Sequence, residues 1–281
     1  MGKIIAVCNQ KGGTGKTTTA INLCACLAEA GKQVLVIDLD PQANATSGLG
    51  IDKYSINKST YNIIIEDTKL EDVVLPTAIK NLKIAPANLD LTGAEVELVG
   101  MIGREYRLKK TLDSQKHQYD FIFIDSPPSL GLLTVNALGS SGSVLVPVQC
   151  EYYALEGLTQ LMNTIKLVRE NLNSNLSIEG ILLTMADFRT NLTNQVIAEV
   201  QKYFQQEEIF SFGHKPKVYK TIIPRNIRLT EAPSFGKPIT LYDKHSVGAQ
   251  KYQELANEIL GLVTEPIKDV PQGTEAITQG E

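Results

Sequence analysis

The sequence predicts an α/β fold in which a mostly parallel, twisted sheet is flanked by helices on both faces. Short runs of β-branched residues and leucine recur along the chain and alternate with longer segments of helical apolar spacing. These runs are continuously apolar, as is typical of strands buried on both faces of a parallel sheet. The 281 residues are enough for one large domain of this kind.

The first strand is expected at residues 4–8, and a helix that begins near residue 16 is expected to run towards Ala30. The glycine-rich segment 9–18 (NQKGGTGKTT) joins them. In such a strand–turn–helix unit, backbone N–H groups surround a phosphate and the helix dipole adds partial positive charge. The segment therefore predicts a nucleotide-phosphate site.

The loop departs from the usual P-loop pattern at one position. The pattern G-x-x-x-x-G-K-[ST] ends here in Gly15, Lys16 and Thr17, but Gln10 stands where its first glycine belongs. A second lysine, Lys11, directly precedes two further glycines. The two lysines around the glycines strengthen the prediction of a phosphate site.

Two later strands are expected to end in carboxylates. Residues 33–42 carry Asp38 and Asp40 at the end of an apolar run, and residues 119–128 carry Asp125 in the same place. An apolar strand followed by aspartate is the Walker B pattern, whose carboxylate holds the magnesium shell. Because ligands bind beyond the carboxyl ends of parallel strands, we expect these side chains near the P-loop.

The rest of the chain continues the alternation of strands and helices. We expect strands at 82–86, 143–148, 178–185 and 218–223, and helices at 61–65, 93–112, 156–172, 191–204 and 246–262. Residues 44–51 and 207–217 are expected to be loops. Residues 1–263 form one predicted domain, and residues 264–281, with four acids and one lysine, form a predicted disordered tail.

Composition narrows the function classes. The net charge of -4 argues against a protein that is basic overall, so any nucleic-acid surface must be local. No apolar run approaches the length of a membrane span, and the strand expected from residue 4 leaves no room for a signal peptide. The four cysteines include no C-x-x-C pair, and we interpret them as small buried residues in a reducing compartment.

Residues 213–237 hold six basic residues and one acid. On the residues alone, a solvated basic edge is the favoured interpretation of this basic segment, with nucleic-acid binding as the alternative.

The motifs together resemble the deviant Walker-A ATPases of the ParA/MinD family. The resemblance rests on residues 11–18 (KGGTGKTT), 38–42 (DLDPQ) and 124–129 (IDSPPS). Residues 147–157 (PVQCEYYALEG) and 223–233 (IPRNIRLTEAP) are similar to the chromosomal ParA, or Soj, branch. The likeness runs to about residue 262, and it implies the deviant Walker-A P-loop NTPase fold.

The resemblance implies roles for the predicted nucleotide site, with ATP as substrate and Mg²⁺ as cofactor. Lys16 would neutralise phosphates in its own protomer, while Lys11 would reach the partner's phosphates in an ATP-sandwiched homodimer. Asp40 would position the attacking water, with Asp38 as the next candidate for that role. The remaining implied contacts are Thr17 to the metal, Asp125 and Asp38 to its water shell, Gly12, Gly13, Gly15 and Thr18 to phosphate, and Pro224 and Asn226 to adenine.

The same resemblance implies DNA binding and a protein partner. Arg189 and Arg228 match arginines that contact DNA without regard to sequence, which now favours DNA over a merely solvated basic edge. The partner would be a ParB/Spo0J-like centromere-binding protein that stimulates hydrolysis. The protein would be cytoplasmic, nucleoid-associated and not membrane-bound, and would serve chromosome or plasmid segregation.

Three other classes fit less well. A MinD-like membrane ATPase needs a basic amphipathic C-terminal helix, but this tail is acidic and carries Pro266 and Pro271. An iron–sulfur relative that bridges a cluster between protomers needs two suitably placed cysteines in each, and here only Cys150 is at a suitable position. A plasmid ParA regulator would need a DNA-reading domain before residue 4.

Overall fold

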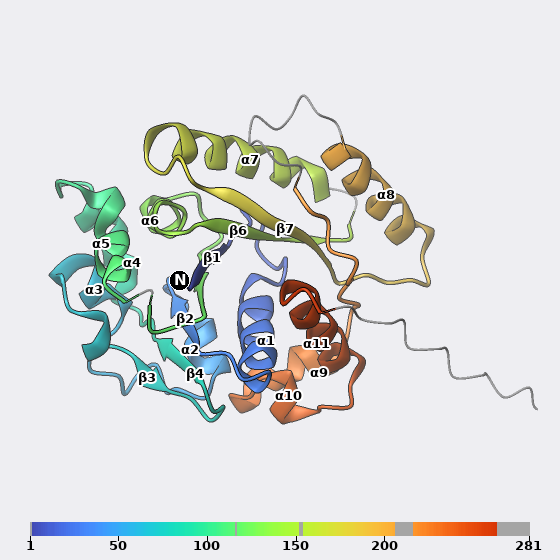
Figure 1. Ribbon diagram of the computed structural model, residues 1–281, viewed down its shortest axis with the longest axis horizontal. Coiled ribbons are helices and arrows are strands. Elements are labelled where there is room, and N and C mark those ends of the chain that lie inside the picture. The colour runs from blue at the N-terminus through green and yellow to red at the C-terminus, as the bar shows by residue number, and fades with distance from the viewer. Residues whose placement is uncertain (1, 116, 152–153, 206–215, 263–281) are drawn as a thin grey trace, which may run out of the picture.

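The computed structural model describes residues 2–115, 117–151, 154–205 and 216–262 (Figure 1). Its centre is a seven-stranded sheet in the order β3-β4-β2-β5-β1-β6-β7. Every neighbouring pair is parallel except β3 and β4. The strands are β1 (Lys3–Val7), β2 (Val34–Asp38), β3 (Leu75–Pro76), β4 (Leu82–Ala85), β5 (Phe121–Asp125), β6 (Ser143–Gln149) and β7 (Ser177–Thr184).

Helices cover both faces of this sheet, so the predicted fold class is confirmed. One layer contains α1 (Lys16–Glu29), α2 (Asn44–Gly48), α9 (Ile227–Glu231), α10 (Ile239–Tyr242) and α11 (Val247–Ile259). The other contains α3 (Thr60–Glu66), α4 (Leu91–Leu98), α5 (Arg107–Asp113), α6 (Leu132–Ser140), α7 (Ala154–Asn171) and α8 (Asn191–Gln205). Short 3₁₀ turns η1 (Leu70–Asp72), η2 (Arg104–Tyr106) and η4 (Ala232–Phe235) complete the assignment.

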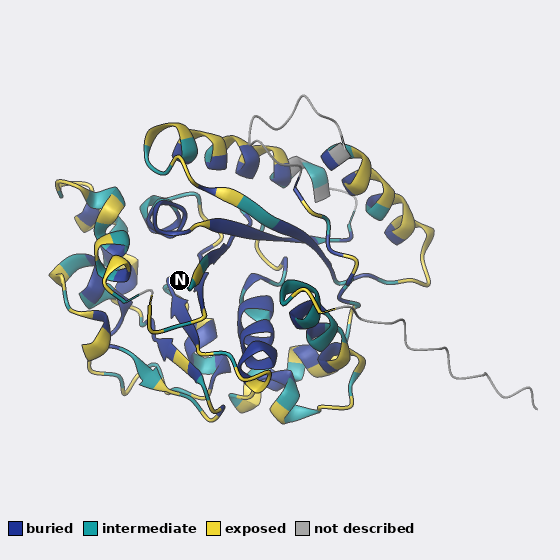
Figure 2. Ribbon diagram, in the orientation of Figure 1, coloured by how far each residue is buried: buried dark blue, intermediate teal, exposed yellow. Residues whose placement is uncertain are grey.

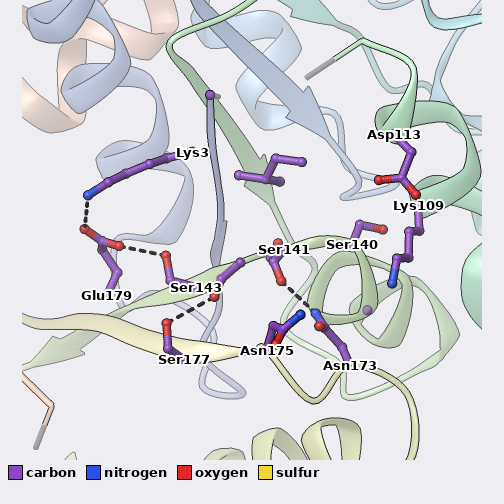
Figure 3. A pocket seen from close by; sticks show the side chains of 14 residues that line it. Lys3, Lys109, Asp113, Ser140, Ser141, Ser143, Asn173, Asn175, Ser177 and Glu179 are labelled. Carbon is purple, nitrogen blue, oxygen red and sulfur yellow. Dashed lines mark hydrogen bonds and ion pairs between the residues drawn. The ribbon is translucent and has the colours of Figure 1, made fainter. Parts of the chain in front are cut away.

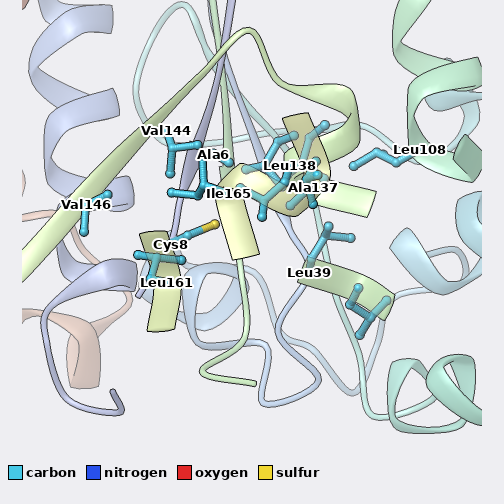
Figure 4. Close-up of a cluster of buried hydrophobic side chains, with 14 of the residues drawn as sticks. Ala6, Cys8, Leu39, Leu108, Ala137, Leu138, Val144, Val146, Leu161 and Ile165 are labelled. Atoms are coloured by element: carbon cyan, nitrogen blue, oxygen red, sulfur yellow. The ribbon is translucent and has the colours of Figure 1, made fainter. Parts of the chain in front are cut away.

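Apolar side chains fill the space on each side of the sheet. Figure 4 shows part of one core, where Cys8, the residue after β1, and Val146 from β6 pack in one cluster with Leu161 and Ile165 of α7. The central strands β2 and β5 are buried along their whole length (Figure 2). Burial on both faces explains why these strands read as continuous apolar runs in the sequence.

Three element predictions were wrong. Residues 44–48 form helix α2 instead of a loop, because buried hydrogen bonds to β2 hold them. The helix predicted at 93–112 is broken between α4 and α5, where Gly103 has a φ of 68°. Residues 218–223 form no strand. Strand-type pairing here is limited to two isolated bridges, one between Val218 and Ile181 of β7 and one between Pro224, the next residue, and Ala186.

All four cysteines are buried and unpaired, as the sequence predicted. Among the described residues, no helix has both the length and the apolar character to cross a membrane. The predicted tail at 264–281 and most of the loop predicted at 207–217 lie outside the described residues.

Candidate functional site

The carboxyl ends of three adjacent strands place the predicted nucleotide residues together. In the sheet register Asp125 at the end of β5 pairs with Asp38 of β2 on one side and with Val7 of β1 on the other. The glycine-rich loop follows β1 directly and leads into α1. The two aspartates and the loop therefore meet at one sheet edge, as the sequence predicted.

The loop is shaped by a buried polar residue and by glycines. The Asn9 amide nitrogen donates to the Pro147 carbonyl over 2.6 Å, and the Asn9 side-chain oxygen accepts the Lys11 N–H over 3.0 Å. Gly13 and Gly15 have φ angles of 75° and 84°, which side chains other than glycine rarely adopt. Asn9 anchors the start of the loop, and the glycines turn it into the helix.

The start of α1 offers its backbone donors to a ligand. Gly15 occupies the N-cap position, and no side chain caps this helix. The first N–H groups of an uncapped helix need a partner, and they lie where the dipole favours an anion. This geometry fits a phosphate at the predicted backbone contacts.

The two lysines occupy different environments. Lys16 is buried, and its ammonium donates to the Lys11 carbonyl over 3.3 Å. Burial lowers the pKa of Lys16, while the charges of Asp125 and Asp40 act in the opposite direction. Lys11 is partly exposed, and its ammonium pairs with Glu151 at 3.3 Å. Lys16 thus lies inside the site and Lys11 at its rim.

Asp125 is the buried carboxylate that most clearly lacks a partner. Neither of its oxygens has a hydrogen-bond partner among the described residues. Burial, then the charge of Asp38, raises the pKa of Asp125 well above its ordinary value. Nearby Thr17 lowers that pKa, although its hydroxyl does not reach hydrogen-bond geometry with either oxygen. Such an unsatisfied carboxylate fits a magnesium shell.

Asp38 is also fully buried, but its carboxylate is occupied. One oxygen accepts the Asp40 N–H over 3.1 Å, and the other accepts the N–H and hydroxyl of Thr46 over 2.8 and 2.7 Å. Burial raises the pKa of Asp38 to about 6, against the lowering effect of these bonds. Asp38 therefore binds α2 and the Asp40 turn, which makes it less available than Asp125 for a metal.

No group of three or more His, Cys, Asp or Glu side chains in the described residues could hold a metal alone. Mg²⁺ commonly binds through one or two carboxylates together with substrate phosphates. Asp125 and the Thr17 hydroxyl beside the P-loop provide such a partial site.

Asp40 lies in a tight turn just beyond β2. One of its oxygens accepts the Gln42 N–H over 2.9 Å, and its carbonyl accepts the Ala43 N–H over 2.8 Å. The side chain is 8% exposed. Its second oxygen accepts no hydrogen bond from the described part of the chain, so it can accept one from a water molecule.

A cavity of about 430 Å³ opens beside the P-loop. It is lined by Gly15 and Thr18 on one side and by Pro224 and Asn226 on the other. The Asn226 side chain also caps α9 by accepting the Leu229 N–H over 3.3 Å. The structure thus brings the predicted adenine residues next to the predicted phosphate residues, which are more than 200 positions away in the sequence.

The two predicted DNA-binding residues, Arg189 and Arg228, lie in two segments that are joined by a backbone hydrogen bond. Arg225 donates its N–H to the Ala186 carbonyl over 3.0 Å, which joins the loop before Arg189 to the segment before Arg228. Both guanidinium groups are exposed and paired locally, Arg189 with Asp187 at 2.7 Å and Arg228 with Glu231 at 3.0 Å. Hydrogen bonds from Arg189 hold the pKa of Asp187 at about 2, so this carboxylate is ionised at neutral pH.

A second cavity, of about 470 Å³, lies at the opposite edge of the sheet, where β1, β6 and β7 begin. Its polar side chains bind one another: Lys3 pairs with Glu179 at 3.4 Å, and Ser143 donates to Glu179 over 2.7 Å (Figure 3). This cavity is remote from the P-loop, and its polar groups are largely satisfied within the fold.

Known proteins similar to this chain agree with the motifs. A sequence profile described as an AAA domain matches residues 2–178. The chain is 59% identical to the sporulation initiation inhibitor protein Soj of Bacillus subtilis over 259 residues, covering 92% of this chain and 98% of Soj. It is 52% identical to the chromosome partitioning protein ParA of Myxococcus xanthus over 260 residues, covering 92% and 88% of the two chains.

The chain belongs to the ParA/Soj family of chromosome-partitioning ATPases. Among solved structures, cobyrinic acid a,c-diamide synthase from Mycobacterium smegmatis with bound ADP and magnesium has a TM-score of 0.78. Its sequence identity is 35%, and the match covers 92% of this chain and 94% of the synthase.

Several residues of this ParA/Soj site escaped sequence reasoning. Thr184 donates its hydroxyl to the Thr14 carbonyl over 2.8 Å and so ties β7 to the P-loop. Thr46 likewise contacts the site from a segment without a recognisable motif, and Arg225 lines the cavity from within residues 223–233, where no role was predicted for it. Glu151 had a usable signal, because it is an acid just beyond an apolar strand, as Asp38 and Asp125 are at theirs.

Proposed function

We propose that this protein is an ATP-dependent switch for DNA segregation. Two copies would sandwich ATP and Mg²⁺, the ATP-bound dimer would bind DNA without sequence preference, and hydrolysis stimulated by a ParB-like partner would release it. The observation that carries the proposal is the arrangement at the P-loop. A buried Lys16 lies inside the site, and a second lysine stands beside an open glycine at the rim.

The described residues support binding of ATP within one protomer. Lys16 and the backbone from Gly12 to Thr18 would hold the phosphates, and the cavity beside Pro224 and Asn226 would hold the base. Mg²⁺ would be held by Thr17 and, through water, by Asp125, with Asp38 as a weaker candidate. When bound, the metal neutralises charge that develops on the phosphates. Relatives in complex with ADP and magnesium favour this assignment.

For hydrolysis, the residue that we propose as general base and water-positioning group is Asp40. Its carboxylate is fixed by the Gln42 N–H, and one oxygen remains available to a water molecule. Lys16 would stabilise charge on the transferred phosphoryl group, which is how P-loop enzymes achieve most of their catalysis.

The dimer is supported by the surface of the P-loop. Gly12 and Gly13 are exposed, and a Cβ atom on either would meet nothing within 4 Å in the monomer. The loop can therefore approach the same loop of a second copy, and Lys11 could then reach the partner's phosphates. This role resembles that of an arginine finger supplied in trans.

Nucleotide state would control DNA affinity through the dimer. Each protomer would contribute Arg189 and Arg228, and joining two such surfaces raises avidity without any new contact. Contacts of this kind to phosphates carry no sequence information and weaken with salt. The protein would then associate with the nucleoid in its ATP form.

The deciding experiment uses Asp40→Ala. We expect this variant to bind ATP, to form a dimer in size-exclusion chromatography, and to be retained on non-specific DNA at low salt without hydrolysing ATP. ADP should give a monomer with little retention. A variant that hydrolyses ATP at the wild-type rate would assign water positioning to another residue, and a monomer with ATP would refute the sandwich dimer.

The ParB-like partner and the absence of membrane binding need separate tests. Adding a ParB protein encoded near the gene should accelerate hydrolysis by the wild-type protein and release it from DNA. Sedimentation with anionic liposomes and ATP should leave the protein in the supernatant. Co-sedimentation would favour the MinD-like alternative.

A further inference from the structure

Thr46 connects three segments of the fold through one hydroxyl. Its side chain is fully buried in α2, and the hydroxyl donates to Asp38 Oδ2 over 2.7 Å. The backbone N–H of Ala87, which follows β4, donates to the same hydroxyl over 2.9 Å. Because a hydroxyl has a single hydrogen, accepting from Ala87 leaves that hydrogen for Asp38. The Thr46 hydroxyl is therefore held in one orientation.

The network continues from Asp38 to the turn that carries Asp40. Oδ1 of Asp38 accepts the Asp40 N–H over 3.1 Å, on the other side of the carboxylate from Thr46. Ala43, between the turn and α2, has a φ of 53°, an unfavourable conformation for a residue with a side chain. Such a conformation persists only where its surroundings enforce it. The bonds around Asp38 provide that enforcement on both sides of Ala43.

We propose that Thr46 is a positioning residue for ATP hydrolysis, acting through the Asp38 carboxylate to hold the Asp40 turn. The inference rests on the proposed function, since it assumes that Asp40 positions the attacking water. It also gives the two strand-end aspartates different roles: Asp125, whose oxygens lack hydrogen-bond partners among the described residues, would hold the magnesium shell, while Asp38, with three donors, orders the turn.

The expected size of the effect follows from what the hydroxyl contributes. Removing it leaves the Ala87 N–H buried without an acceptor and leaves Asp38 Oδ2 with a single donor. A catalytic group displaced by about 1 Å can lose roughly 100-fold in rate. Because the network touches Asp40 and not the P-loop, we expect the loss in kcat and not in ATP binding.

The test compares Thr46→Val, which replaces the hydroxyl with a methyl group, with Thr46→Ser, which keeps it. With ATP and Mg²⁺, Thr46→Val should lower kcat by roughly 10- to 100-fold with KM within about threefold of wild type. Thr46→Ser should restore kcat to within about threefold, since it keeps both hydrogen bonds. Thr46→Val should also accumulate as an ATP-bound dimer, as Asp40→Ala should.

Thr60→Val is the matched control. Thr60 is equally buried, and its hydroxyl donates to the backbone carbonyl of Asp38 over 2.8 Å instead of to the carboxylate. The melting temperature of Thr60→Val should fall, although by less than that of Thr46→Val because one hydrogen bond is lost instead of two, and the kcat of Thr60→Val should stay within about threefold of wild type. If Thr46→Val does not fold, Thr46→Ala removes the same hydroxyl and carries the same expectation.

The outcomes distinguish the inference from the proposed function. Normal kcat in Thr46→Val, failure of Thr46→Ser to restore kcat, or an equal loss of kcat in Thr60→Val would overturn the role of Thr46. A wild-type protein that hydrolyses no ATP even with its ParB-like partner would refute the proposed function itself. Wild-type hydrolysis with the predicted difference between the two valine variants supports both.

Discussion

The Lys11 ammonium lies 3.3 Å from the Glu151 carboxylate within the same chain. The guanidinium of Arg225, which lines the cavity beside the P-loop, lies 3.6 Å from the other Glu151 oxygen. Glu151 thus neutralises two cations at the rim of the nucleotide site. For Lys11 to contact a partner's phosphates, as we propose, it must leave this carboxylate.

We predict that Glu151→Gln favours the ATP-bound dimer by releasing Lys11. All three side chains are partly exposed, so the ion pairs contribute about 0.2–1 kcal/mol each. Because the dimer releases one Lys11 from each protomer, its dissociation constant should fall by up to about 30-fold. Analytical ultracentrifugation in an Asp40→Ala background measures this change. Glu170→Gln breaks a comparable exposed pair with Lys166 and should have no effect. A weaker dimer in Glu151→Gln would contradict the prediction.

Gly12→Val should block the dimer without disturbing the monomer. A Cβ atom on Gly12 would meet no atom within 4 Å in one protomer, so the melting temperature should stay near that of wild type. In the sandwich, the same side chain would occupy space that the opposing loop needs. Gly100→Val is the control, because a Cβ there is equally unhindered. Dimerisation of Gly12→Val with ATP in size-exclusion chromatography would place the interface elsewhere.

The sequence predicted the phosphate loop and the strand-end aspartates because these depend on local order. A glycine-rich turn between an apolar strand and a helix, and an acid after a buried strand, are readable without knowing the partners in space. That Asp38 and Asp125 lie at the same edge follows from the parallel sheet, because each stands at the carboxyl end of its strand, whereas their exact register comes from the structure.

Two of the three wrong predictions depended on contacts outside the segment itself, whereas the helix predicted at 93–112 is broken at Gly103 by its local backbone conformation. Residues 44–48 are helical because Asp38 binds Thr46, a contact that glycine, serine and threonine content does not reveal. Residues 218–223 have strand-like composition, but they bond to β7 only at intervals, through Ile181 and Leu183. The prediction that Pro224 and Asn226 contact adenine came from the family resemblance, because no local sequence pattern places these residues beside Gly15.

Arg189→Ala with Arg228→Ala should weaken ATP-dependent retention on non-specific DNA. Each lost phosphate contact should reduce the salt slope by about 1, and removing the arginines leaves Asp187 and Glu231 unpaired and repulsive to DNA. Filter binding across a salt series measures both effects. Lys110→Glu is the control, because it removes an exposed cation of α5 that also pairs with an acid, and it should change neither the retention on DNA nor the salt slope. Unchanged retention in the double variant would move the DNA surface to other residues.

The cysteines should not react in the native protein at pH 8. Burial raises the pKa of Cys8 to about 12 and that of Cys150 to about 11, so both thiols stay protonated, and the thiolate is the reactive form. Iodoacetamide followed by mass spectrometry should give four modifications in urea and none without it. Rapid labelling of Cys150 in the native protein would contradict its burial.

The same shifts set the sign of a pH effect on stability. A thiol whose pKa is higher when folded than its ordinary 9.0 binds its proton more tightly in the folded state. The free energy of unfolding should therefore be unaffected by these thiols below pH 8 and should fall as the pH rises above 9.

Gly180→Ala should destabilise the fold where residues 216–226 pack on β7. A Cβ on Gly180 would collide with the ring of the buried Tyr219. The backbone N–H of Tyr219 donates to the Ile181 carbonyl over 3.0 Å, which holds Tyr219 in place beside β7. Such overpacking costs roughly 1–3 kcal/mol, which urea unfolding would detect. Gly142→Ala, with only an ordinary contact at 3.8 Å, is the control.

Removing the ring should recover part of that loss. In a double-mutant cycle, adding Gly180→Ala should cost less in a Tyr219→Ala background than in wild type, because the two groups no longer collide. The segment that Tyr219 anchors continues into Pro224 and Asn226 at the cavity beside the P-loop. Gly180→Ala should therefore also weaken ATP binding, measured by fluorescent-nucleotide titration. If stability falls while ATP affinity is unchanged, the cavity is held in place independently of β7.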